Sequence, residues 1–125
     1  MKKDLVILIV DDNIRFADRM TEMLEDLSNI DSIKVASGYD DGFKLFIEQK
    51  PKLVLLDINL PGKNGIELLK AIRKSDWACE VIIITNHSNE YYRQQCRELG
   101  VQHFLDKSNE FALVPEIVSQ RVFYE

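Results

Sequence analysis

Several residue types are scarce in this chain, and each scarcity argues against a class of protein. Cys79 and Cys96 are too few and too widely spaced for a disulfide framework or a cysteine metal site, so we expect two reduced thiols in a cytosolic protein. Only 5 glycines and 3 prolines occur in 125 residues, of which 46% are hydrophobic. This composition is typical of a globular chain rather than a disordered one.

Long apolar runs and excess positive charge are also missing. No run approaches the about 20 residues that span a bilayer, and residues 1–4 do not resemble the start of a signal peptide. The 16 Lys and Arg residues are outnumbered by 21 Asp and Glu, which gives a net charge of −5. Because binding to a phosphate backbone needs clustered Lys and Arg, we expect neither nucleic acid nor membrane as a direct partner. The length fits one domain, residues 1–125, with no output domain.

Five segments have the composition of β-strands. Four are apolar runs rich in branched residues, which is typical of strands buried on both faces of a parallel sheet. The second segment is weaker, because a lysine interrupts it. The segments are Leu5–Val10, Ser32–Ala36, Leu53–Leu56, Val81–Ile84 and Phe104–Leu105.

The stretches between these segments place apolar residues at helical spacing. We expect Asp12 or Asn13 to cap the first helix, Pro51 to stop the second, Gly100 to close the fourth and Pro115 to lie in the first turn of the fifth. The apolar faces are Phe16, Met20, Met23, Leu24 and Leu27; Phe43, Phe46 and Ile47; Ile66, Leu69 and Ile72, after Gly65; Tyr92, Cys96 and Leu99; and Phe111, Val114, Ile117 and Val118. The alternation predicts a flavodoxin-like (βα)5 α/β fold, with a doubly wound five-stranded parallel sheet of order 2-1-3-4-5.

Polar residues stand at the ends of four of the predicted strands. Asp11 and Asp12 follow the first, Asp57 the third, Thr85 the fourth, and Lys107 comes just after the fifth. The carboxyl ends of parallel strands share one edge of the sheet, and ligands bind there. Three carboxylates, a hydroxyl and an ammonium at one edge suit a divalent cation, Mg²⁺ above all, and a phosphoryl group.

Asp57 is the best-placed nucleophile of this set. It follows four apolar residues and precedes a loop whose carbonyls could reach a metal. A carboxylate that attacks phosphorus forms an acyl phosphate, and Lys107 and Thr85 could stabilise the phosphoryl oxygens. Taken singly, each residue has a simpler explanation: Asp11 and Asp12 as helix caps, Thr85 as a strand end and Lys107 as a solvated surface residue.

Four motifs in this order resemble the receiver domain of two-component response regulators. The resemblance covers nearly the whole chain, and the stretch 104–111 is similar to receivers of the chemotaxis-regulator kind that often stand alone. The motifs are Val10–Asp12, Leu55–Gly62, Ile83–Thr85 and Phe104–Lys107.

The resemblance implies phosphorelay signal transduction in the cytoplasm. Asp57 would accept a phosphoryl group from a phosphohistidine on a sensor histidine kinase or a phosphotransfer protein. Mg²⁺ would be held by Asp12, Asp57 and the main-chain carbonyl of Asn59, with Asp11 acting through water. Such a chain is a signalling switch rather than an enzyme, since it catalyses only its own aspartyl phosphorylation and dephosphorylation.

The same resemblance implies a switch pair and a site mouth. Thr85 would move toward the phosphoryl group, and the ring of Phe104 would turn inward into the vacated space. Asn86, where a small residue is frequent, and His87 would narrow the mouth of the site. Ser108 stands where proline is frequent, so a cis bond after the preceding lysine would cost about 3–4 kcal/mol and its geometry stays open.

Three other functions compete with this interpretation. A phosphohydrolase of the haloacid dehalogenase type would need a second aspartate where Asn59 stands. A flavodoxin-like cofactor binder would need a phosphate loop where Asp11 and Asp12 stand, and these carboxylates would repel phosphate. A receiver-like scaffold that is never phosphorylated is the third. The downstream partner is either another protein or an output domain missing from this chain, and we favour the stand-alone form.

Two aromatic features outside the site could cover or form surfaces. Trp77 lies in a predicted loop, where we expect it to cover a helix end. Tyr91 and Tyr92 open the fourth predicted helix, and we expect one ring to pack inward while the other offers a partner surface.

Overall fold

The computed structural model describes residues 2–3, 5–87, 89–121 and 123–124, and its centre is a five-stranded sheet. All neighbouring strands of this sheet are parallel, in the order β3-β2-β4-β5-β6. Counted along the sheet-forming segments, that order is 2-1-3-4-5, so the predicted topology is confirmed. The strands are β2 (Leu5–Val10), β3 (Ile30–Ala36), β4 (Leu53–Leu56), β5 (Glu80–Thr85) and β6 (His103–Asp106).

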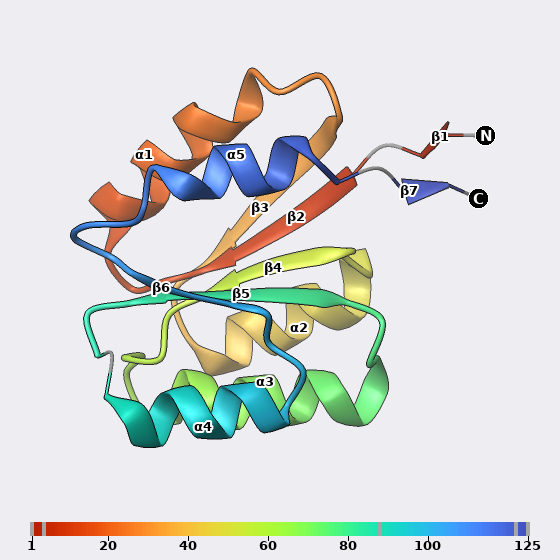
Figure 1. Ribbon diagram of the computed structural model, residues 1–125. Coiled ribbons are helices and arrows are strands. Elements are labelled where there is room, and N and C mark those ends of the chain that lie inside the picture. Colours follow the sequence, from red (N-terminus) through yellow and green to blue (C-terminus); the bar gives the residue numbers. More distant parts are fainter. Residues whose placement is uncertain (1, 4, 88, 122, 125) are drawn as a thin grey trace.

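Helices cover both faces of the sheet (Figure 1). One face carries α1 and α5, and the other carries α2, α3 and α4. Each face has its own apolar cluster, because successive residues of the central strands point to opposite sides. The helices are α1 (Ile14–Glu25), α2 (Tyr39–Gln49), α3 (Gly65–Ser75), α4 (Glu90–Glu98) and α5 (Leu113–Ser119).

Three helices begin at asparagine caps, so that each follows its strand at a defined angle. The side-chain oxygens of Asn13, Asn64 and Asn89 each accept a hydrogen bond from the main-chain N–H three residues further on. Glu67 completes a capping box, because its carboxylate accepts the N–H of Asn64 in return. The third helix therefore starts at Gly65 itself rather than after it.

Two further helix-boundary predictions are confirmed, and one expectation about burial is wrong. Gly100 has φ of 79° just past the end of α4, and Pro115 is the third residue of α5, within its first turn. Ile47 was expected on the inner face of α2 but is 49% exposed, whereas Phe46 is buried. Both residues fall in the apolar pattern, but Phe46 belongs to the buried cluster of that face and Ile47 does not.

The ends of the described chain form a second, small sheet that the sequence pattern did not predict. Strand β1 (Lys2–Lys3) pairs antiparallel with β7 (Phe123–Tyr124). Figure 1 shows the two segments side by side, beyond the starts of the main strands. Two-residue strands are too short to show a periodicity of two, so no sequence signal announces them.

Candidate functional site

The sequence-predicted polar residues meet at the carboxyl edge of the sheet. Asp11 and Asp12 follow β2, Asp57 follows β4, Thr85 ends β5, and Lys107 follows β6. One carboxylate oxygen from each aspartate lies within 4.8 Å of the other two. The parallel topology thus assembles the three carboxylates from two strands that are neighbours in the sheet.

The ammonium of Lys107 forms ion pairs with two of the three carboxylates. Its Nζ lies 2.8 Å from Oδ2 of Asp11 and 3.1 Å from Oδ2 of Asp57, and 4.5 Å from the ring centroid of Phe16. Burial disfavours the charged ammonium, but the hydrogen-bonding and charge of Asp11 and Asp57 outweigh it, so the pKa of Lys107 is raised. The ammonium is therefore held charged in the centre of the site.

Asp11 is the most constrained of the three aspartates. Its side chain is 2% exposed, and its Oδ1 accepts a hydrogen bond from the N–H of Asn13 at 2.8 Å. Oδ2 is buried, and the Lys107 ammonium lies against it at 2.8 Å. Burial raises the pKa of Asp11, against the opposing effects of Lys107 and the Asn13 N–H.

Asp12 and Asp57 differ in how far water reaches them. Asp12 is exposed, whereas Asp57 is 4% exposed. The Oδ1 atom of Asp57 accepts a hydrogen bond from the N–H of Asn59 at 3.1 Å, so the loop after β4 folds back over the carboxylate. This donor set of one exposed and two buried carboxylates fits a hard divalent cation.

A glycine allows the loop after β4 to pack this closely. A Cβ on Gly65 would lie 2.1 Å from the main-chain oxygen of Asp57 and 2.8 Å from Cα of Ile58, so only glycine fits there. The N–H of Gly65 donates to the carbonyl of Ile58 at 2.8 Å. The start of α3 is thereby tied directly to the residue that follows Asp57. The predicted loop contained this glycine, but only the close approach shows why it is needed.

Thr85 is fully buried at the end of β5. Its Oγ1 accepts a hydrogen bond from the N–H of His87 at 3.1 Å, and its carbonyl accepts the N–H of Lys107 at 2.9 Å. Asn86 and His87 are both exposed beside it. The hydroxyl of Ser108 donates to Oδ1 of Asn86 at 3.2 Å, so the loops after β5 and β6 are joined beside the site.

Phe104, in β6, is half-buried and packs against the cluster beneath α2, α3 and α4. The guanidinium of Arg93, from α4, lies 4.6 Å from its ring centroid. This contact covers the outer side of the ring with a cation, as is common for arginine and aromatic side chains. Phe104 therefore contacts a side chain of α4 and is not fully buried in the core.

The turn after Lys107 is built by a residue that sequence reasoning overlooked. No peptide bond in the described residues is cis, including the Lys107–Ser108 bond. Instead Oδ1 of Asp106 accepts the N–H groups of Ser108 at 2.8 Å and Asn109 at 3.0 Å, and the N–H of Asp106 donates to the carboxylate of Glu110. An aspartate that caps the two following turn residues is a recognisable signal, and it could have been read from the sequence.

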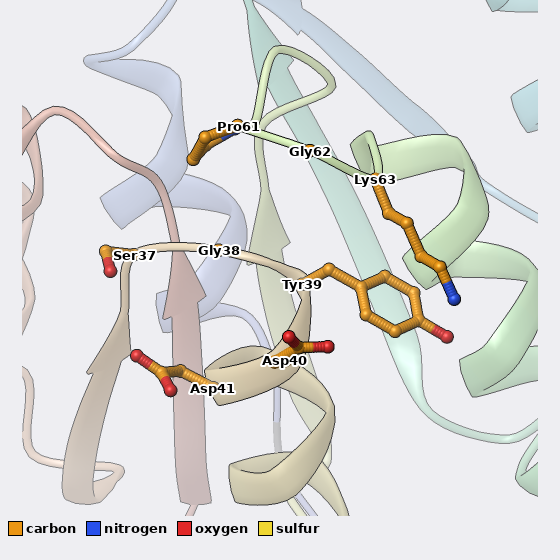
Figure 2. Close-up of a pocket in the computed structure, with 8 residues that line it drawn as sticks. All are labelled: Ser37, Gly38, Tyr39, Asp40, Asp41, Pro61, Gly62 and Lys63. Carbon is orange, nitrogen blue, oxygen red and sulfur yellow. The ribbon is translucent and has the colours of Figure 1, made fainter.

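A cavity of about 350 Å³ opens beside the acidic site, between the loops after β3 and β4 (Figure 2). Figure 2 shows Lys63 alongside the ring of Tyr39, and its Nζ lies 4.8 Å from the ring centroid. Asp40 and Asp41 lie in the first turn of α2, where negative charge offsets the helix dipole. We assign these residues to the stability of the loops rather than to chemistry. The lining is Ser37, Gly38, Tyr39, Asp40, Asp41, Pro61, Gly62 and Lys63.

A doubly wound parallel sheet with an aspartate cluster, a hydroxyl and an ammonium at its carboxyl edge is the arrangement of an α/β domain of the receiver type. Residues 7–119 match the response regulator receiver domain, and this chain belongs to that family. The family match sets aside the phosphohydrolase and the flavodoxin-like cofactor binder as interpretations.

Two curated relatives illustrate the match. The chain is 33% identical over 106 residues to protein-glutamate methylesterase/protein-glutamine glutaminase of Idiomarina loihiensis, covering 83% of this chain but only 27% of that protein. It is 27% identical over 101 residues to the response regulator GacA of Pseudomonas aeruginosa, covering 81% of this chain and 47% of GacA. The chain thus spans less than half the length of either relative.

Solved structures agree with this family. The Mn²⁺-bound form of response regulator Rcp1 is 30% identical, with a TM-score of 0.78 and coverage of 93% of both chains. The signal receiver domain of a DNA-binding response regulator from Colwellia psychrerythraea is 28% identical, with a TM-score of 0.84, covering 94% of this chain and 97% of that one. Among the described residues, we find no helix long and apolar enough to cross a membrane.

Proposed function

We propose that this chain is a phosphorylation-controlled switch in which Asp57 accepts a phosphoryl group from a phosphohistidine of a sensor histidine kinase or phosphotransfer protein. The observation that carries the proposal is the setting of Asp57. Its carboxylate is buried, one oxygen is held by the Asn59 N–H, and the other lies 3.1 Å from the Lys107 ammonium. A carboxylate fixed in this way is oriented for attack and has a cation beside it.

The bond changes of the transfer are simple. An oxygen of Asp57 forms a bond to phosphorus, the bond from phosphorus to the donor imidazole nitrogen breaks, and its electron pair stays on that nitrogen. The Lys107 ammonium and the Thr85 hydroxyl would contact the oxygens of the transferred group. The chemistry is confined to this chain's own aspartate, so the protein acts as a signalling switch and not as an enzyme on other substrates.

Mg²⁺ fits the carboxylate cluster of this site. Asp12, Asp57 and the Asn59 carbonyl would hold it directly, with Asp11 acting through water. The three carboxylates within 4.8 Å of one another, with one ammonium beside them, support this assignment. When bound, the ion supplies positive charge that balances the charge of the phosphoryl oxygens. The Mn²⁺-bound Rcp1 structure supports a divalent cation in a related protein.

The signal would leave the site through Thr85 and Phe104. A hydroxyl that turns toward the phosphoryl group vacates space, and the Phe104 ring can turn inward to fill it. That movement would end the contact between Phe104 and Arg93 and so change the surface of α4. A ligand that binds one of two such arrangements better shifts their populations by its difference in affinity.

The residues at the mouth of the site would set the rates at which Asp57 is phosphorylated by small donors and its acyl phosphate is hydrolysed. Asn86 and His87 are exposed beside Thr85, and Ser108 donates a hydrogen bond to Asn86. Joined side chains at this position would restrict small phosphodonors and attacking water. We therefore expect slow phosphorylation by acetyl phosphate and a long-lived acyl phosphate.

We place the chain, as a single receiver domain of residues 1–125, in the cytoplasm, where it would act on a downstream protein or on an output domain. The competing interpretation is a receiver-like scaffold that is never phosphorylated. The contact between Asp57 and the Lys107 ammonium, with Thr85 at the end of the strand beside Lys107, favours the phosphorylated form. The relatives that match carry further domains, and this supports an output partner of some kind.

Mass spectrometry after incubation with acetyl phosphate and Mg²⁺ tests the proposal. One phosphoryl group should be added to the wild-type chain, and none to Asp57→Asn. Asp12→Asn should keep the acceptor and lose most of the Mg²⁺-dependent rate, which makes it the matched control for metal binding. A label that persists in Asp57→Asn, or a wild-type chain that is never labelled by acetyl phosphate or by any phosphohistidine donor, would favour the scaffold.

A switch through Phe104 is tested separately by hydrogen exchange with a beryllofluoride mimic. Exchange should change across residues 85–107, where the mimic would bind Thr85 and Lys107. Phe104→Leu, which keeps an apolar core residue but removes the ring, should weaken the change on α4. If exchange is unaltered while the mimic is bound, the proposed switch through Phe104 is wrong, whereas the proposed phosphorylation of Asp57 is not contradicted.

A further inference from the structure

The only tryptophan of the chain is exposed but held in place. Trp77 is 61% exposed. The guanidinium of Arg73 lies 5.2 Å from its ring centroid, and Gly100 also approaches the ring, since a Cβ there would lie 3.1 Å from the indole. The sequence predicted that this ring covers a helix end, and it lies against Gly100, which is just past the end of α4. A large aromatic ring that is exposed and already fixed loses little entropy when a partner covers it.

Arg73 is the support of this ring. It is buried, on α3, and donates hydrogen bonds to four main-chain carbonyls at 2.5–3.3 Å. The carbonyls belong to Leu99, Asp76, Trp77 and Cys79. These bonds tie the loop before β5 to the end of α4, so the indole sits on a rigid base.

A groove of about 380 Å³ runs beside the ring, between α3 and the end of α4. Leu99 and Trp77 provide its apolar part, and Lys70 and Lys74 stand one helical turn apart along its side, both exposed. Neither lysine forms an ion pair with a carboxylate in the described residues. A chain of net charge −5 therefore carries a local cationic rim around a fixed, exposed tryptophan.

We propose that this groove, which we call the Trp77 groove, binds an acidic protein segment that carries an aromatic or aliphatic side chain. The apolar side chain would lie on Trp77 and Leu99, and its flanking carboxylates would face Lys70 and Lys74. Charge complementarity favours an acidic peptide over nucleic acid, because two free lysines are too few to hold a phosphate backbone that the rest of the chain repels. Trp77 precedes β5 whereas Thr85 ends it, so the partner would leave the acidic site open.

A random peptide library displayed on phage, selected against the full chain, tests this inference. Selected peptides should be rich in Asp, Glu and one large apolar residue, and should perturb the backbone NMR signals of Lys70, Lys74 and Leu99. Lys74→Glu should weaken binding by about tenfold, as reversal of a charge beside a bound segment does. Lys44→Glu, an equally exposed charge reversal on α2, should leave the affinity unchanged.

Further variants and ligands distinguish an acidic peptide from the other possible occupants of the Trp77 groove. Trp77→Ser should abolish peptide binding, and circular dichroism would show whether this variant folds. If it does not fold, Lys74→Glu still tests the proposal, because Lys74 lies on the surface. Asp57→Asn should bind peptide normally, so the outcome does not depend on phosphorylation. The proposal is overturned if the selected peptides lack acidic residues, or if Lys44→Glu weakens binding as much as Lys74→Glu does. It is also overturned if the chain binds a single-stranded DNA 20-mer more strongly than the peptides, or if it self-associates and Trp77→Ser removes that self-association.

Discussion

Replacing Asp11 with asparagine should make the metal-free protein more stable while weakening its response to Mg²⁺. Asp11 is buried, and burial raises its pKa even though the Lys107 ammonium lies 2.8 Å from Oδ2. At pH 7 the folded protein therefore carries a carboxylate that would be better solvated in the unfolded chain. Asparagine keeps the size and an acceptor for the Asn13 N–H, and it removes the charge.

The expected gain is the difference between two opposing effects. Taking the Asp11 carboxylate out of water is the unfavourable effect, and for a buried ion it amounts to several kcal/mol. The ion pair with Lys107, at 2.8 Å, offsets part of that cost, and it would be lost with the charge. Because the pKa of Asp11 is raised overall, the unfavourable effects are larger than the favourable one. We expect a net gain of about 1 kcal/mol, or about 4 °C in Tm for a domain of this size.

The pH dependence of the gain follows from the direction of the pKa shift. An acid whose folded-state pKa lies above its unfolded value binds more protons when folded, so its contribution to stability falls as the pH rises through that interval. Above the folded-state pKa of Asp11, the wild type carries the full cost and the asparagine variant does not. As the pH falls through it, Asp11 becomes neutral in the wild type, and the two proteins should converge.

Urea denaturation followed by circular dichroism, with EDTA at pH 7, measures the gain, and Asp12→Asn is its matched control. Asp12 is exposed, so its variant should change metal-free stability little, yet both variants should lose stabilisation by Mg²⁺. That stabilisation amounts to about 2.7 kcal/mol when Mg²⁺ is at a hundredfold excess over its Kd. The reasoning is refuted if Asp11→Asn is less stable than the wild type in EDTA, or if Asp12→Asn gains as much.

Three further changes test the packing that holds the site and its neighbours. Gly65→Ala should lower the free energy of unfolding by about 3 kcal/mol in the same urea titration, since its Cβ would lie 2.1 Å from a main-chain oxygen. Gly38→Ala is the control, because its Cβ would have no neighbour nearer than 3.9 Å, and it should cost less than about 1 kcal/mol. Arg73→Lys should cost about 2 kcal/mol, because an ammonium cannot reach four carbonyls, and a full-stability lysine variant would contradict the assigned bonds. A double-mutant cycle of Glu80→Gln and Arg121→Met should give a coupling of about 1 kcal/mol for the half-buried, two-point ion pair, and additive single effects would argue against it.

Most of the fold could be predicted because its signals are local. The strand Val81–Ile84 is a run of branched apolar residues, and only a strand buried on both faces uses such a run. Once five strands alternate with helices, right-handed crossovers leave few topologies. The pairing of Lys2–Lys3 with Phe123–Tyr124 could not be predicted, since it joins opposite ends of the chain and each strand has two residues. Ile47 shows the other limit: a helical pattern gives a face, but not how far the next helix covers it.

The membership of the site could also be predicted, because parallel strands bring their carboxyl ends to one edge. The environment of each member could not. Asp11 and Asp12 are adjacent and chemically identical, yet one is buried and the other exposed, since successive residues leaving a strand point to opposite sides. Nor does sequence alone show that Lys107 bridges Asp11 and Asp57, because that depends on how the turn built by Asp106 aims the lysine side chain.

These environments suggest how the proposed site would respond to ligands. Three carboxylates lie within 4.8 Å of one another, and the single ammonium of Lys107 contacts two of them, so the metal-free site keeps an excess of negative charge, which costs free energy. A bound divalent cation would remove this cost, and a phosphoryl group on Asp57 would then give Lys107 and the Thr85 hydroxyl a new common partner. Because the Lys107 N–H is bonded to the Thr85 carbonyl, the ends of β5 and β6 are mechanically joined. A change at the acidic edge would therefore reach Phe104 along β6, because Phe104 lies only three residues before Lys107.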